Sequence, residues 1–243
     1  MTCGEETEKE CLDAVSAHSK DFVFQEVRNL TPQTVALNTM IHQCNTEFLV
    51  PLDADFVLYK NFWQRMNHAI DMYRHEQRWH SILFPLWEDL TQRKVRSIKI
   101  FRTAIIKKIP YRNTRHPDFT HFNDLKNNGY NAIDLYAEPP IGDHVIRGNE
   151  RCYFKFKDWF LCLRSVKTKA EVAQKAKDFL TMFEKLYNQT KNNDYLYCIT
   201  GLYDGLTDGE GLGHSKDAFE KNMRISLDEI PKIKKHILKQ ILL

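Results

Sequence analysis

The chain has 243 residues, of which 42% are hydrophobic and 28% are charged, and its formal net charge is +3. This length and apolar content suffice for an α/β domain with a helical appendage. The small net charge argues against the strongly basic face that binds nucleic acid, so nucleic-acid partners are excluded. No apolar run reaches the roughly 18 residues of a membrane span, and the acidic N-terminus lacks a signal-peptide pattern, which predicts a cytoplasmic protein.

The first half of the chain alternates helical and strand-like patterns. Apolar positions with helical spacing predict helices over residues 5–18 and 31–44. Short β-rich runs predict strands over residues 22–27 and 46–52. The second of these runs is almost continuously apolar, which is typical of a strand that a parallel sheet buries on both faces.

The same alternation continues to residue 137. The expected elements are, in chain order, a helix over 60–77, strands over 82–86 and 97–102, a helix over 119–128 and a strand over 131–137. Because strands and helices alternate along this part of the chain, we expect an α/β fold with a mostly parallel sheet.

From residue 150 the pattern changes character. It is helical to residue 186, rich in turn residues from 188 to 213, and helical again to residue 243. The sequence therefore predicts two parts, an α/β domain over residues 1–148 and a helical C-terminal region over residues 149–243.

Two acidic side chains follow the most apolar of the expected strands. Asp53 and Asp55 are separated by Ala54 alone, and side chains two residues apart on an extended chain point the same way. Both carboxylates can then approach one hard cation, Mg²⁺ or Mn²⁺, that is shared with phosphate oxygens. In an open α/β sheet the ligand crevice lies beyond the carboxyl ends of the strands, where this pair falls. The alternative is an ordinary acidic turn.

The residues around this pair resemble a known family. The segments Thr46–Phe56 and Leu37–Ile41 are similar to the DxD segment, and to the helix before it, in family 2 glycosyltransferases of the GT-A fold. The resemblance implies a GT-A-like fold and a glycosyltransferase that takes a UDP- or GDP-linked nucleotide sugar and a glycan or other hydroxyl acceptor. It also implies that Asp53 and Asp55 bind the metal and the donor, and that the reaction inverts the anomeric carbon.

A further carboxylate precedes the helix expected over 119–128. Asp118 is followed eleven residues later by Gly129 and Tyr130, an interval that resembles the family's acidic pair ahead of a helix. The resemblance implies that Asp118 is the general base for the acceptor hydroxyl, a nucleophile that needs one. Pro117 stands where the family has the other acid of the pair. An Asp in front of a helix is also a favoured cap, and the two roles are compatible.

Three other side chains complete the expected site. His144 follows the last strand of the domain, where the resemblance implies a further metal ligand, and the alternative is a surface or capping group. Arg147 can offer a bidentate fork to a phosphate, or it is a solvated surface residue. Trp87 can stack on the acceptor sugar, or it belongs to the core.

The resemblance covers residues 2–146 only, and the strand–helix–strand unit that opens the family's fold has no counterpart. Three explanations are open: the protein is longer, a partner chain completes the sheet, or the domain no longer turns over. The alternative function is therefore a catalytically inactive GT-A-fold binding or scaffold protein. A nucleotidyltransferase would need a Gly-rich phosphate loop, which the sequence lacks.

The C-terminal segment 226–243 combines an apolar stripe with basic residues. A helix with this pattern can dock on the protein, lie on an anionic membrane surface or bind a partner. The stripe and the basic side consist of Leu227, Ile230, Ile233, Ile237, Leu238, Ile241 and Leu242, and of Lys232, Lys234, Lys235 and Lys239.

Overall fold

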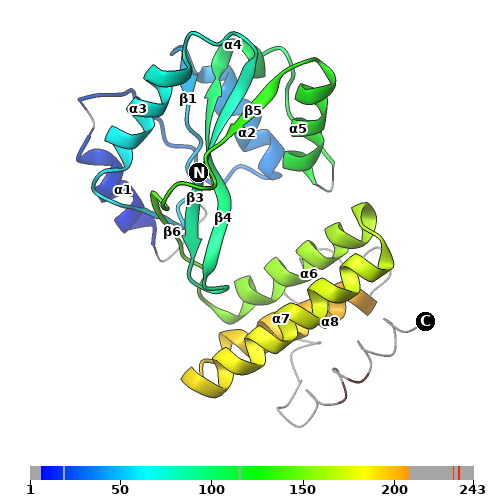
Figure 1. Ribbon diagram of the computed structural model, residues 1–243. Helices are drawn as coiled ribbons and strands as arrows, with labels where there is room; N and C mark the ends of the chain where they lie inside the picture. The colour runs from blue at the N-terminus through cyan, green and yellow to red at the C-terminus, as the bar shows by residue number, and fades with distance from the viewer. Residues whose placement is uncertain (1–6, 19, 115, 208–231, 233–234, 236–243) are drawn as a thin grey trace. The chain divides into compact units, whose positions relative to one another are not determined.

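The computed structural model describes residues 7–18, 20–114, 116–207, 232 and 235. The chain divides between Val145 and Ile146 into two compact units, here called the sheet unit and the helical unit (Figure 1). None of the helices in the described residues is long and apolar enough to cross a membrane. The amphipathic stripe expected over 226–243 lies, except for residues 232 and 235, outside the described part of the chain.

The helices of the sheet unit fall where the sequence predicts them, with the short α4 in addition. They are α1 (Glu8–Ser16), α2 (Gln33–Gln43), α3 (Phe62–Tyr73), α4 (Thr103–Ile106) and α5 (Pro117–Asn127). The apolar faces that predict them are buried against the sheet. Helices α1 and α3 contribute Val15, Phe62 and Met66 to one core, and α2 contributes Leu37 and Ile41 to another.

Six strands form one sheet in the order β1-β4-β3-β6-β2, and β5 also pairs with β3. The long central strands β3 and β4 carry the most deeply buried side chains, among them Ile82, Leu86 and Ile98. The strands are β1 (Phe48–Leu49), β2 (Phe56–Leu58), β3 (Trp79–Glu88), β4 (Arg93–Arg102), β5 (Asn131–Asp134) and β6 (Gly142–His144).

The expectation of a mostly parallel sheet is wrong, because the sheet is mixed. Strand β4 runs antiparallel to β1 and β3, and β2 runs antiparallel to β6, whereas β3 pairs in parallel with β5 and β6. The cause is the short turn Asp89–Gln92, which returns the chain from β3 directly into β4. A turn of this length makes a hairpin, whereas a parallel neighbour needs a long crossover.

Two expected strands are shorter or missing. Of the run 46–52 only Phe48 and Leu49 pair, with β4, at one edge of the sheet, and the run is not the buried central strand that its composition predicts. Pro51 has no N–H to donate to a ladder, which restricts pairing beyond that point. Residues 22–27 form no strand. A partner chain that adds to the edge at β1 stays a prediction.

The buried histidine His80 gives the sheet unit an acid-sensitive position. His80 is 2% exposed and packs edge-on against Phe122. Burial and the nearby His121 lower the pKa of His80 to about 4. The unfolded chain therefore takes up this proton first, so stability is fully present above the unfolded pKa of about 6.5 and is lost as the pH falls toward 4, by up to ~3 kcal/mol.

We expect His80→Leu to flatten this dependence. Urea unfolding at pH 7.0, 5.5 and 4.5 should show a smaller loss of unfolding free energy in the variant than in the unaltered chain. His75→Leu, a change at an exposed position, is the control and should keep the original slope. Equal slopes in the His80 and His75 variants would contradict the prediction.

The helical unit holds α6 (Asn149–Val166), α7 (Lys169–Thr190) and α8 (Asp194–Thr207). Helix α7 begins with a capping box between Thr168 and Glu171. Buried aromatic rings form the core of the helical unit. They are Phe156 and Phe160 from α6 and Phe179 and Phe183 from α7.

The expectation of a turn-rich segment over 188–213 is wrong where α8 lies. Gly201 and Gly205 are not turn residues but permit close contact between α8 and α6. A Cβ atom on Gly201 would lie 2.1 Å from the carbonyl oxygen of Tyr153, and one on Gly205 would lie 2.6 Å from that of Lys157. Both glycines therefore occupy one face of α8 that has no room for a side chain.

Gly201→Ala should destabilise the helical unit. In an exposed helix this change adds stability, but here the methyl group must force α8 away from α6. We expect a loss of roughly 1–3 kcal/mol, measured as a lower midpoint of thermal unfolding by circular dichroism. An unchanged or higher midpoint would show that the two helices do not pack this closely.

Candidate active site

Asp53 and Asp55 lie in the turn that connects β1 to β2. The backbone N–H of Phe56 donates to the carbonyl of Asp53 at 3.1 Å, and that of Val145 donates to the carbonyl of Asp55 at 2.9 Å. The second bond ties the turn to the end of β6. Asp55 is 9% exposed and Asp53 is partly buried, so both carboxylates are held on a fixed backbone with little water around them.

The two carboxylates are close enough to affect one another. The pKa of Asp53 is raised to about 6, mainly by burial and by the negative charge of Asp55, with Lys99 opposing and Asp118 adding a smaller effect. A pair of partly desolvated carboxylates that repel each other is stabilised by a divalent cation between them. The metal site expected here stays a prediction, because the pair also lies in a turn closed by the bond from Phe56 to Asp53.

His144 lies between two carboxylates. Its Nε2 atom is 3.4 Å from Oδ2 of Asp55, and its Nδ1 atom is 3.3 Å from Oε1 of Glu88. The exposed fractions of the side chains are 14% for His144, 13% for Asp55 and 4% for Glu88. Sequence reasoning missed Glu88, which reads as part of a polar turn after β3. The signal that could have found it is a single carboxylate at the end of a strongly apolar strand.

Asp55 and His144 can provide two of the ligands that a divalent cation requires. The described residues contain no group of three His, Cys, Asp or Glu side chains arranged to hold an ion. Asp55 Oδ2 and His144 Nε2 do converge, and their separation of 3.4 Å is near the ~3 Å between neighbouring ligands of an ion bound at about 2.1 Å. Mg²⁺ and its chemical relatives keep several waters and take phosphate oxygens, so two or three protein ligands suit them.

Asp118 lies in the first turn of α5, and its carboxylate makes two contacts through Oδ1. The hydroxyl of Tyr111 donates to it at 3.2 Å, and Nζ of Lys99 is 2.8 Å away. The residue at the cap position is His116, and no side chain caps this helix, so the capping alternative for Asp118 is wrong. Asp118 is about half exposed, and its charge is a minor cause of the raised pKa of Asp53.

The structure does not bring Trp87 into this group. Trp87 precedes Glu88 on β3, and successive side chains of a strand point to opposite faces, so the indole lies on the other face from Glu88. It is 37% exposed, which is inconsistent with a core position, and a role in acceptor binding stays a prediction. Arg147 follows the division at Val145 and belongs to the helical unit, and its assignment to phosphate also stays a prediction.

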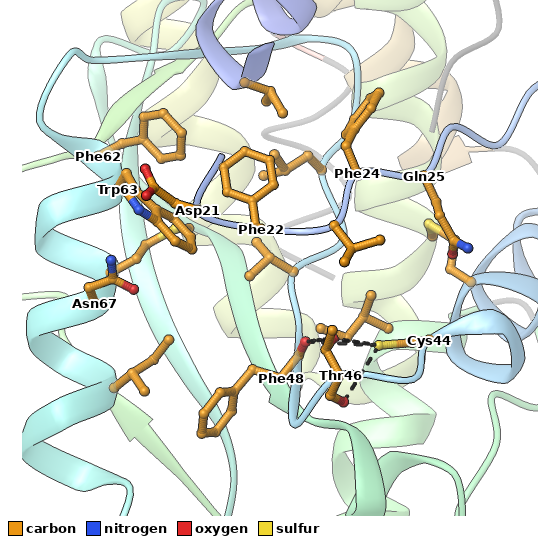
Figure 2. Close-up of a pocket in the computed structure, with 18 of the residues that line it drawn as sticks. Asp21, Phe22, Phe24, Gln25, Cys44, Thr46, Phe48, Phe62, Trp63 and Asn67 are labelled. Carbon is orange, nitrogen blue, oxygen red and sulfur yellow. Dashed lines mark hydrogen bonds between the residues drawn. The ribbon is translucent and has the colours of Figure 1, made fainter. Parts of the chain in front are cut away.

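The sheet unit also contains a cavity of about 470 Å³. Figure 2 shows aromatic side chains around it, with Phe22, Phe48 and Trp63 on its walls. Ala54 is part of the lining, but Asp53 and Asp55 are not. Among the described residues the lining has one arginine, Arg74, which pairs with Glu47 at 2.9 Å. A mainly apolar lining of this kind does not suit a diphosphate.

No protein-family model matches the chain, and no curated protein sequence matches it significantly. The structure is similar to a mannosyltransferase from Pyrobaculum calidifontis in complex with GDP-Man and Mn²⁺, with 11% identity and a TM-score of 0.42, over 98% of this chain and 74% of that one. It is similar to residues 1–349 of S. aureus TarS with 12% identity and a TM-score of 0.35, over 95% of this chain and 66% of that one. Both TM-scores are below 0.5.

Proposed function

We propose that the sheet unit is a metal-dependent glycosyltransferase site that binds a UDP- or GDP-linked sugar and transfers the sugar to a hydroxyl acceptor. The observation that carries this proposal is the convergence of Asp55 and His144 at 3.4 Å beside Asp53, whose pKa is raised to about 6. The resemblance of the segment around them to family 2 of the GT-A fold supports the same reaction, with inversion at the anomeric carbon.

Each side chain has a stated part in the reaction. Asp53, Asp55 and His144 would hold a Mn²⁺ or Mg²⁺ ion, which would supply the charge that neutralises the departing diphosphate. Asp118 accepts the proton of the acceptor hydroxyl. Tyr111 and Lys99 both contact Oδ1 of Asp118, which fixes the position of the carboxylate.

The reaction can be tested without knowing the acceptor. Many transferases hydrolyse their donor slowly, so the full chain is incubated with UDP- and GDP-linked hexoses and Mn²⁺, and released UDP or GDP is measured. We expect release with at least one donor, and we expect EDTA to stop it. Release that persists in EDTA would contradict the role of the metal.

A second candidate is a protein that keeps nucleotide binding without turnover. The contact that favours it is the ion pair between Lys99 and Asp118 at 2.8 Å, because this contact occupies an oxygen of the carboxylate that would have to accept the proton. This candidate predicts saturable binding of UDP or GDP with no release from any donor. Release in the unaltered chain would exclude it.

A further inference from the structure

We propose that Glu88 is the positioning residue of His144: it holds the Nδ1 side of the imidazole so that Nε2 faces the cation site at Asp55. This inference rests on the proposed function, since it concerns a metal ligand. Neither the sequence pattern nor the family resemblance suggests that Glu88 positions His144.

The backbone fixes the distance between the two side chains. Glu88 and His144 are the last residues of β3 and β6, and they are partners in the parallel pairing of these strands. The backbone N–H of Asp89 donates to the carbonyl of His144 at 3.2 Å, and that of Val145 donates to the carbonyl of Asp55 at 2.9 Å. Glu88, His144 and Asp55 are therefore carried by three adjoining segments of main chain, and a site on such elements is more rigid than one on a loop.

The side-chain contacts restrict the imidazole from three directions. Oε1 of Glu88 is 3.3 Å from Nδ1, an ion-pair contact that does not meet hydrogen-bond geometry. Oδ2 of Asp55 is 3.4 Å from Nε2, and the ring of Phe56 meets the imidazole edge-on at 5.3 Å. Glu88 is itself oriented, because the hydroxyl of Thr91 donates to its other oxygen at 2.5 Å. With Glu88 on one ring nitrogen, the other nitrogen is the one directed at Asp55.

The burial of Glu88 argues for a task that needs its charge. Its side chain is 4% exposed. Leu86, two residues earlier on the same face of β3, is fully buried. A carboxylate placed there costs several kcal/mol unless a partner compensates it. The charged neighbours of Glu88 are His144 at 3.3 Å and Arg93, with which it interacts electrostatically. A histidine that binds a metal commonly donates its second N–H to a carboxylate, and loss of that carboxylate weakens metal affinity.

The test uses Mn²⁺ with the full chain, Glu88→Gln, and Glu47→Gln as a charge-matched control at an exposed ion pair. Mn²⁺ affinity is read from the electron paramagnetic resonance of the free ion, and pulsed measurements of the bound ion detect the ¹⁴N coupling of a coordinated imidazole. We expect Glu88→Gln to raise the Mn²⁺ dissociation constant about 10- to 100-fold and to weaken the ¹⁴N coupling. Glu47→Gln should change neither, and His144→Gln gives the signal without the imidazole.

The outcomes separate this inference from the proposed function. Mn²⁺ binding and ¹⁴N coupling that are the same in Glu88→Gln and in the unaltered chain would overturn the role of Glu88 and leave the metal site in place. Failure of the unaltered chain to bind Mn²⁺, with or without GDP, would overturn both. If Glu88→Gln does not fold, Glu88→Asp replaces it. This variant keeps the charge but moves it away from the ring, so an unchanged ¹⁴N coupling would also overturn the inference.

Discussion

The Asp55→Asn variant is expected to lose Mn²⁺-dependent binding of UDP or GDP and to release nucleotide from the donor at least ~1,000-fold more slowly than the unaltered chain. The metal stabilises the departing diphosphate by several kcal/mol, and each 1.36 kcal/mol is a factor of about ten in rate. Asn has the same shape as Asp but no charge, and Asp55 is one of the two side chains that converge at 3.4 Å. The measurement is the rate of nucleotide release at saturating Mn²⁺.

The matched control for this variant is Asp143→Asn. Asp143 adjoins His144 on β6 but accepts a hydrogen bond from the hydroxyl of Tyr59 at 2.6 Å, and alternation along the strand places it on the opposite face. The control should keep nucleotide binding and release near those of the unaltered chain. Asp55→Asn with normal release, or an equal loss in Asp143→Asn, would contradict the assignment of the cation to Asp55.

The Asp118→Asn variant is expected to transfer sugar about 100- to 10,000-fold more slowly, the usual contribution of a general base, while it binds nucleotide and Mn²⁺ as the unaltered chain does. The amide keeps the contact with Tyr111 but cannot accept the proton of the acceptor. The two variants thus differ in kind: the Asp55 change removes binding, and the Asp118 change removes the chemical step. Single-turnover rates and nucleotide titrations on the same preparation measure both.

The control for Asp118 lies on the same helix. Asp124 of α5 accepts two hydrogen bonds from Arg112, at 2.8 and 2.7 Å, and neither contact involves the carboxylate pair. Asp124→Asn should therefore leave the single-turnover rate unchanged. Asp118→Asn with an unchanged rate would show that another group takes the proton.

The sequence singles out Asp53 and Asp55 because their spacing is local, and the structure shows Asp55 in contact with His144 at 3.4 Å. The role of the pair as a metal site stays a prediction. The direction of the strands is not local: it depends on the turn at residues 89–92, which makes β3 and β4 a hairpin. Glu88 could not be recognised because its partner His144 is distant in sequence, and only the pairing of β3 with β6 brings the two side chains together.

A helix, α8, lies where the sequence predicts a turn-rich segment over residues 188–213. Gly201 and Gly205 favour turns when the sequence is considered alone. In the structure their lack of a side chain serves the contact of α8 with α6. A glycine required by close packing and a glycine required by a turn have the same local signal, and only the neighbouring helix distinguishes them.

The central claim is that Asp53, Asp55 and a divalent cation together bind a nucleoside diphosphate. The most direct measurement is a calorimetric titration of GDP and of UDP into the full chain with Mn²⁺ and with EDTA, repeated on the Asp53→Asn/Asp55→Asn double variant. We predict saturable heat from at least one nucleotide with Mn²⁺, and none with EDTA or in the double variant. No saturable heat at millimolar nucleotide, or binding that the double variant keeps, would contradict the account.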